Sequence, residues 1–284
     1  MSTLYKTINR HFNFNQSQIL AGTVIFYREF IQQNLQIITH KMFFLARRQS
    51  LSYVKVITFN EATEAIHSFS HDKSPGSDGL TCEFYVQFWA TIGPDLINVF
   101  NYAVRNGLLS RSQRTGVIIL LYEKGKKELL KKNWRPITFL NIDYKVLTKC
   151  LAHRLRKVMP AVVNCDQTCS VKGRSIFETT SLIRDTIDYI NLTNAPGPLL
   201  CIDQMKAFDR LSWDFMFRTL SELGFGTNFI NFVYISYTDI FSMIKLKGYV
   251  SEPFSLHRGT RQGCPLKALL YVLRSELLAE ATRD

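Results

Sequence analysis

The sequence has no long apolar run. None of its 284 residues belongs to a stretch that approaches the ~20 residues needed to cross a bilayer. Residues 19–27 are apolar, but Arg28 and Glu29 follow them directly. Residues 1–28 contain no acidic residue, which leaves a signal or transit peptide open, although no small-residue cleavage site follows. We therefore expect no membrane partner and a place inside the cell, in the nucleus or the cytoplasm.

Cysteine and histidine are scarce, with six of each. Six cysteines do not make a disulfide framework in a chain of this length, so we expect a reducing compartment. Cys82, Cys150 and Cys201 lie among apolar residues and are expected in the core. Cys165 and Cys169 form a single C-x-x-x-C pair. Because no histidine or cysteine group has zinc-ligand spacing, we predict no zinc site.

Acidic residues are also in short supply. The chain has 23 of them against 35 lysines and arginines, a net charge of +12, and its pI is about 9.5. Residues 161–284 are neutral, whereas residues 105–157 hold 14 basic and 3 acidic residues. A solvated protein face can be basic, but a concentration this high favours a surface that binds nucleic-acid phosphates.

Only 8 prolines and 14 glycines occur, and 46% of residues are hydrophobic, which excludes a disordered or collagen-like chain. Residue patterns predict an α+β fold, and residues 124–132 form a basic loop. Pro160 is expected to end one helix, and Gly107 to follow another as its C-cap. We expect helices over 58–69, 81–90, 94–106, 141–159, 175–190, 212–223, 228–237 and 265–281, strands over 117–122 and 199–203, and a hairpin of 242–246 with 250–256.

Asp203 ends the apolar run Leu199-Leu-Cys-Ile. A carboxylate at the end of a strand is a suitable ligand for the Mg²⁺ ions of nucleotidyl transfer, although an aspartate in this place more often serves a turn. The run continues as Asp203-Gln-Met-Lys-Ala-Phe-Asp-Arg-Leu-Ser-Trp213. A second segment, Arg258-Gly-Thr-Arg-Gln-Gly-Cys-Pro-Leu266, is a glycine-containing loop that leads into a helix. Such a loop lets its backbone and Gln262 approach a base pair closely.

These two segments resemble palm motifs of the reverse transcriptase domain of LINE-type non-LTR retrotransposons, which are transposable elements. Lys73–Trp89, Asn133–Leu155 and Asp166–Thr179 resemble further blocks of that family, in the family's order. The resemblance implies an RNA-directed DNA polymerase, a nucleotidyltransferase with the fingers and palm of a right hand and a ferredoxin-like palm sheet. Its partners would be an RNA template, a DNA primer and dNTP. The division would be a divergent basic segment over 1–57, a fingers-like region over 58–195 and a partial palm over 196–284.

The resemblance also implies roles for single residues. Asp203 would be the catalytic carboxylate and a ligand of Mg²⁺, and Phe208 the steric gate that rejects a ribose 2′-hydroxyl. Phe208 taken alone is more often a core aromatic, and Asp209 a helix cap. The resemblance further implies three groups of residues that contact the substrates. Gln204, Met205 and Arg135 would contact the incoming nucleotide, Gln262 and Gly263 the nascent base pair, and Lys73, Lys172 and Arg174 the template.

The sequence departs from the family at several places, of which two bear most on function. The family's next palm motif, an aromatic-x-Asp-Asp, occurs nowhere in the 284 residues. In addition, Lys267-Ala268 stands where the family usually has Ser-Pro. We therefore expect a truncated domain that is inactive alone, since Asp203 by itself cannot complete the usual carboxylate set. The alternatives are a non-catalytic nucleic-acid-binding fragment and a functionless relic of a retrotransposon.

Overall fold

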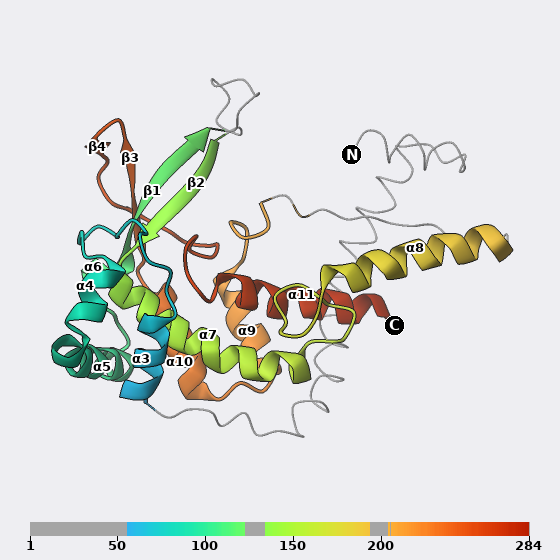
Figure 1. The fold of residues 1–284 in the computed structure, drawn as a ribbon, viewed down its shortest axis with the longest axis horizontal. Coiled ribbons are helices and arrows are strands. Elements are labelled where there is room, and N and C mark those ends of the chain that lie inside the picture. The colour runs from blue at the N-terminus through green and yellow to red at the C-terminus, as the bar shows by residue number, and fades with distance from the viewer. Residues whose placement is uncertain (1–55, 123–133, 194–203, 205, 284) are drawn as a thin grey trace.

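The structure is a computed structural model that describes residues 56–122, 134–193, 204 and 206–283. It is a mixed α/β arrangement, which confirms the α+β prediction (Figure 1). Among the described residues, no helix is both long and apolar enough to cross a membrane. The helices are α3 (Phe59–His67), α4 (Cys82–Gln87), α5 (Trp89–Asn106), α6 (Arg111–Arg114), α7 (Ile142–Val162), α8 (Ile176–Thr193), α9 (Trp213–Glu222), α10 (Thr227–Tyr237) and α11 (Lys267–Arg283).

One small sheet stands out from the helices at the upper left of Figure 1. Its strands are β1 (Thr115–Tyr122), β2 (Trp134–Leu140), β3 (Phe241–Leu246), β4 (Tyr249–Val250) and β5 (Phe254–Ser255). The order is β2-β1-β3-β4, with β5 also paired to β3. β1 pairs with β2 antiparallel and with β3 parallel. The sheet therefore joins the predicted fingers-like and palm regions, and the boundary between them stays a prediction.

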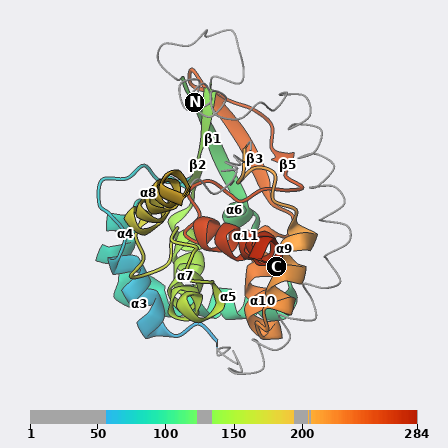
Figure 2. The ribbon, with the colours of Figure 1, turned by 90° about the vertical axis from the view of Figure 1, so that its right-hand side faces the viewer.

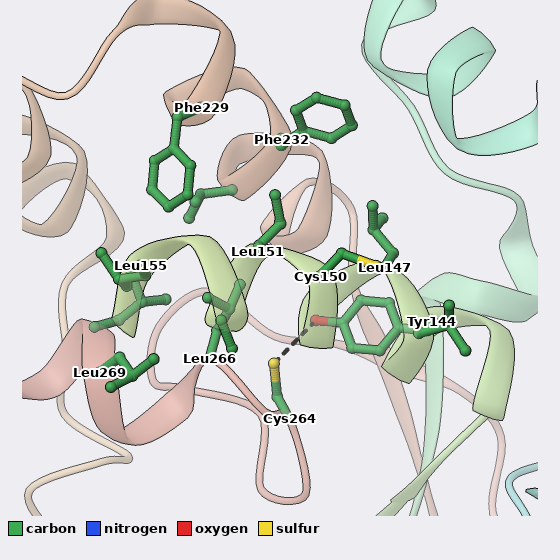
Figure 3. Close-up of a cluster of buried hydrophobic side chains, with 14 of the residues drawn as sticks. Tyr144, Leu147, Cys150, Leu151, Leu155, Phe229, Phe232, Cys264, Leu266 and Leu269 are labelled. Carbon is green, nitrogen blue, oxygen red and sulfur yellow. Dashed lines mark hydrogen bonds between the residues drawn. The ribbon is translucent and has the colours of Figure 1, made fainter. Parts of the chain in front are cut away.

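Helix α7 runs through the centre of the hydrophobic core. Its Leu147, Leu151 and Leu155 are at most 1% exposed and recur every four residues, so they share one face. Figure 3 shows this face beside Phe229 of α10 and Leu269 of α11. Each such side chain stabilises the fold by about 1.5–3 kcal/mol when it leaves water. The core thus holds α10 and α11 against α7, and α11 begins at the end of the Arg258–Leu266 loop.

Local signals set several helix ends where the sequence predicts them. Thr58 and Glu61 form a capping box at α3, in which each side chain bonds the other's backbone N–H. Gly107 ends α5 in the left-handed conformation, with φ of 76°. Cys82 and Cys150 are buried as expected. The predicted strand over 199–203, with Cys201, and the basic loop over 124–132 lie outside the described residues.

One expectation at a proline is wrong, and one strand that contains a proline was not predicted. Pro160 does not end α7, which continues to Val162. The missing N–H of Pro160 removes only one helical bond, and the N–H of Val163 still donates to the carbonyl of Met159 at 2.9 Å. The strand β2 was not predicted, because Pro136 interrupts its pattern. Pro136 is tolerated there because, among the strands that the structure describes, β2 lies at the edge of the sheet and pairs only with β1.

Candidate functional site

A pocket of about 450 Å³ lies between the sheet and the loop that precedes α11. Its apolar wall comes mainly from Ile118 of β1 and Pro136 of β2. Asp209, from the turn before α9, lies at the same pocket. Thr138 of β2 and Ser242 of β3 line it as well, and the remaining lining residues are Ser255, Leu256, His257, Arg258, Gly259, Thr260, Arg261 and Gln262. The pocket therefore joins strands of the sheet, the turn before α9 and residues 255–262, and its lining runs from Ile118 to Gln262 in the sequence.

Backbone hydrogen bonds hold the 258–263 loop against the turn before α9. The N–H of Gly259 donates to the carbonyl of Leu211 at 2.7 Å, and the N–H of Thr260 donates to the carbonyl of Phe208 at 2.7 Å. The indole N–H of Trp213 donates to the carbonyl of Gly259 at 2.8 Å. Gly259 has φ of 85°, and a Cβ there would lie 2.9 Å from the carbonyl oxygen of Asp209. The structure thus brings the two palm-like segments into direct contact.

Gly263 sets the approach of the loop to strand β2. Its φ is 83°, and a Cβ on it would lie 2.8 Å from the carbonyl oxygen of Thr138. Only glycine fits this close approach without a shift of the backbone. Gln262, the residue before it, is half-buried and lines the pocket. The predicted pair Gln262 and Gly263 therefore lies beside β2. The point of closest approach is Thr138, which follows Pro136 by two residues in that strand.

Arg261 holds the same loop against the residues just before β1. It is 3% exposed, and its Nη1 donates to the carbonyl of Gln113 at 3.1 Å. Its guanidinium lies 4.4 Å from the centre of the Tyr144 ring, and Gly116 leaves room for it. Burial raises the pKa of the nearby Asp143 carboxyl, and the charge of Arg261 partly opposes that rise. Sequence reasoning missed this anchor, since a glycine-rich loop gives no sign of which arginine turns inward.

One face of α11 holds the turn that follows Asp203. The Oε1 atom of Gln204 accepts hydrogen bonds from the Tyr271 hydroxyl and from Nη1 of Arg274, both at 2.8 Å. The rings of Phe208 and Tyr271 are 4.9 Å apart, and Nζ of Lys267 lies 4.0 Å from the centre of the Phe208 ring. These α11 residues were not predicted. Their spacing of four and three residues, which places them on one helix face, is the signal that could have found them.

The remaining predicted residues do not gather at this pocket. Arg135 is exposed on β2, next to Pro136, and pairs in register with Leu121. Lys73 and Lys172 are exposed in loops. Arg174 donates to the carbonyls of Asn164, Gln167, Pro160 and Val163, so its donors serve the end of α7. Asp203 and Met205 lie outside the described residues.

The described residues do not by themselves fit a magnesium site. Over the described ranges, no group of three or more His, Cys, Asp or Glu side chains could hold a metal ion. Asp209, the carboxylate at the pocket, is exposed and adjoins Lys267, whose charge it attracts. Burial lowers the pKa of the Lys267 ammonium, and Asp209 partly opposes this.

Comparison with known proteins gives consistent matches. Residues 123–282 match the family model described as reverse transcriptase (RNA-dependent DNA polymerase). The chain is 40% identical over 220 residues to the transposon TX1 uncharacterized 149 kDa protein of Xenopus laevis, which covers 78% of this chain and 17% of that protein. It is 25% identical over 224 residues to the probable RNA-directed DNA polymerase from transposon BS of Drosophila melanogaster, covering 77% and 24%.

A third match is to the Pol polyprotein from the type-1 retrotransposable element R2 of Popillia japonica. The two are 28% identical over 143 residues, which is 49% of this chain and 19% of that protein. The chain thus spans about a fifth of the length of these curated relatives. What the relatives share with it is one region of a much larger polypeptide.

Proposed function

Because the chain belongs to the reverse transcriptase (RNA-dependent DNA polymerase) family, we propose that its pocket binds an RNA template paired to a DNA primer, with the incoming dNTP. The transposon and R2 relatives confirm the resemblance to LINE-type non-LTR retrotransposons that the five sequence blocks predicted. The proposal includes the activity of the whole protein, which is RNA-directed DNA synthesis, and its partners, which are the RNA template, the DNA primer and the dNTP.

The contact between the turn at Phe208 and the loop at Gly259 and Thr260 carries the proposal. Two segments 48 residues apart meet there through short backbone hydrogen bonds, and the pocket lies at their junction. Two segments can pack closely without leaving a pocket, so the pocket at this junction favours a ligand site. The apolar wall of Ile118 and Pro136 suits the face of a base, and the exposed Arg258 suits a phosphate.

Template-directed synthesis joins the 3′-hydroxyl of the primer to the α-phosphate of the dNTP, with pyrophosphate as the leaving group. Phe208 would exclude a ribose 2′-hydroxyl, and Arg135 would contact the triphosphate. Gln262 and Gly263 would pack on the nascent base pair, at the place where the loop approaches β2. Lys73 and Lys172 would follow the template backbone through charge. Arg174 would act through the fold, because its donors already bind protein carbonyls.

Reverse transcriptases use divalent metal ions, in general Mg²⁺, which when bound neutralise the charge that develops on the phosphates. On our proposal Asp203 is one of the ligands. The 284 residues contain no aromatic-x-Asp-Asp, so we propose that this stretch binds its substrates but does not polymerise alone. We also propose a fingers-like region over 58–195, a partial palm over 196–284 and a place inside the cell, in the nucleus or cytoplasm.

The test combines binding with primer extension. We expect the chain to bind an RNA template–DNA primer duplex with an affinity that falls steeply as salt rises. Lys172→Ala should weaken binding because its charge follows the template backbone, whereas Arg184→Ala, an exposed change in α8, should not. Salt-independent or absent binding would contradict the proposal. With Mg²⁺ and dNTP, the chain alone should not extend the primer; extension that Asp203→Ala abolishes would show that it is a complete catalyst.

A further inference from the structure

A lysine ammonium rests on the ring of Phe208. Nζ of Lys267 lies 4.0 Å from the ring centre, well inside the ~6 Å range of cation–π attraction. Lys267 is half-buried, and the Tyr271 ring contacts the same phenyl ring at 4.9 Å between centres.

The surroundings hold the ammonium in this place. Lys267 is the first residue of α11, and its N–H donates to the carbonyl of Cys264 at 3.1 Å. Leu266, directly before it, is fully buried in the core. The carboxylate of Asp209 adjoins Phe208 in the sequence and attracts the ammonium. The Lys267 ammonium therefore has both a ring face and a carboxylate beside it, which a lysine that merely lies along the surface does not have.

We infer that Lys267 is a positioning residue for sugar selection, which acts by holding the Phe208 ring in place. This inference rests on the proposed function, in which Phe208 is the gate against a ribose 2′-hydroxyl. A gate of this kind discriminates only when the ring cannot swing away from the hydroxyl. The cation on one face of the ring restricts that motion, and Tyr271 restricts it further. Because the attraction requires charge, arginine can replace lysine, whereas a neutral side chain of similar length cannot.

The test measures nucleotide binding without chemistry. The full chain is loaded on an RNA template–DNA primer duplex whose primer ends in a dideoxynucleotide, in buffer with Mg²⁺. Calorimetric titration with the complementary dNTP and rNTP gives the ratio of their dissociation constants. We expect the wild type to bind the rNTP about tenfold or more weakly. Lys267→Met should reduce this ratio about threefold, mainly by strengthening rNTP binding, and Lys267→Arg should restore it. Phe208→Ala should remove the discrimination.

Each outcome decides the inference. Discrimination that is equal in the wild type and in Lys267→Met overturns it and leaves the proposed function standing. A wild type that binds neither nucleotide overturns the proposed function, and the inference with it. Thermal unfolding is the folding control: Lys267→Met and Lys267→Arg must both show the unfolding transition of the wild type. If Lys267→Met does not fold, Lys267→Gln gives the same comparison with a shorter neutral side chain.

Discussion

Helices α7 and α8 carry the same kind of sequence signal and lie in opposite surroundings. Both show apolar residues at helical spacing, and both were predicted as helices. α7 has ten buried residues, whereas α8 has none among its described positions. Figure 1 shows the reason: α7 lies within the group of helices, and α8 extends away from it, so that α8 is seen end-on in Figure 2. Periodicity therefore predicts a helix, but the neighbours of that helix decide whether its apolar face is buried.

The apolar residues of α8 make the contrast sharp. Ile176, Ile183, Ile187 and Ile190 recur at spacings of seven, four and three residues, which places them along one stripe. Ile176 is 72% exposed, although an isoleucine at this spacing in α7 would be in the core. Matched substitutions in buried and exposed parts of the molecule test whether this difference in burial also appears in the free energy of unfolding.

The largest difference is expected for matched leucines. Leu151→Ala in α7 removes a fully buried side chain and should lower the free energy of unfolding by about 2–5 kcal/mol. Leu182→Ala in α8 removes a side chain that is 61% exposed, and should change it by less than about 0.5 kcal/mol. Urea denaturation followed by circular dichroism measures both. Equal losses in the two variants would mean that α8 is packed as closely as α7.

Matched arginines come next. Arg174→Ala, at the junction between α7 and α8, removes hydrogen bonds to four backbone carbonyls and should cost about 2–3 kcal/mol. Arg184→Ala in α8 removes an ion pair with Asp185 in which both side chains are about 70% exposed, and should have little effect. The same denaturation experiment compares them. A negligible cost at Arg174 would leave that residue available for the template contact that its sequence block implies.

Two glycines with the same backbone conformation give a smaller contrast. Gly173 and Gly263 have φ of 82° and 83°, so alanine at either should cost about 1–2 kcal/mol. At Gly173 a Cβ would meet no atom within 4 Å, whereas at Gly263 it would lie 2.8 Å from the Thr138 carbonyl oxygen. We expect Gly263→Ala to be the less stable variant and to bind RNA–DNA duplex more weakly. Identical behaviour in denaturation and in duplex binding would argue against the close approach of the loop to β2.

The smallest effect concerns pH. Burial disfavours the charge of Glu61 in α3, but hydrogen bonds and attraction from Arg154 of α7 outweigh it, so the pKa of Glu61 falls below its ordinary value of 4.5. The stabilisation is therefore present above that ordinary value and is lost as pH falls through the lower pKa of the folded state. Because the pair is partly exposed, we expect less than about 1 kcal/mol.

Unfolding measured from pH 6 down to pH 2 tests this expectation. The difference in stability between the wild type and Glu61→Gln should narrow as the solution becomes acidic. Asp185→Asn in α8 serves as the control, because its exposed ion pair should contribute little at any pH. A difference that stays constant over the whole range would show that the carboxylate of Glu61 does not gain its partner on folding.

Much of the fold could be predicted from the sequence because its signals are local. The capping box at Thr58, the left-handed Gly107 and the spacing of leucines in α7 each act within a few residues. Strand β2 could not be predicted, since Pro136 is compatible with a strand only at a sheet edge, and edge position is a property of the whole sheet. The same holds for Pro160, which the last turn of α7 accommodates.

The candidate site likewise has parts that the sequence predicted and parts that only the structure shows. The family resemblance identified the two palm-like segments, and the structure shows that they are in contact at Gly259 and Thr260. The inward turn of Arg261 depends on Gly116 and Tyr144, which are far away in the sequence. The position of Lys267 over Phe208 depends on where α11 begins relative to the turn. Side chains that join distant segments are therefore the part that sequence reasoning does not reach.

The most direct test of the central claim is to locate the bound nucleotide. The chain is loaded on an RNA template–DNA primer duplex that presents uracil, irradiated with 8-azido-dATP, and digested for mass spectrometry. We predict labelled peptides from Gln204–Arg210, Arg258–Gly263 or Trp134–Leu140, with labelling that unlabelled dATP suppresses and that a non-complementary template removes. Labelling confined to α5 or α8, or labelling that dATP does not compete with, would contradict the assignment of this pocket.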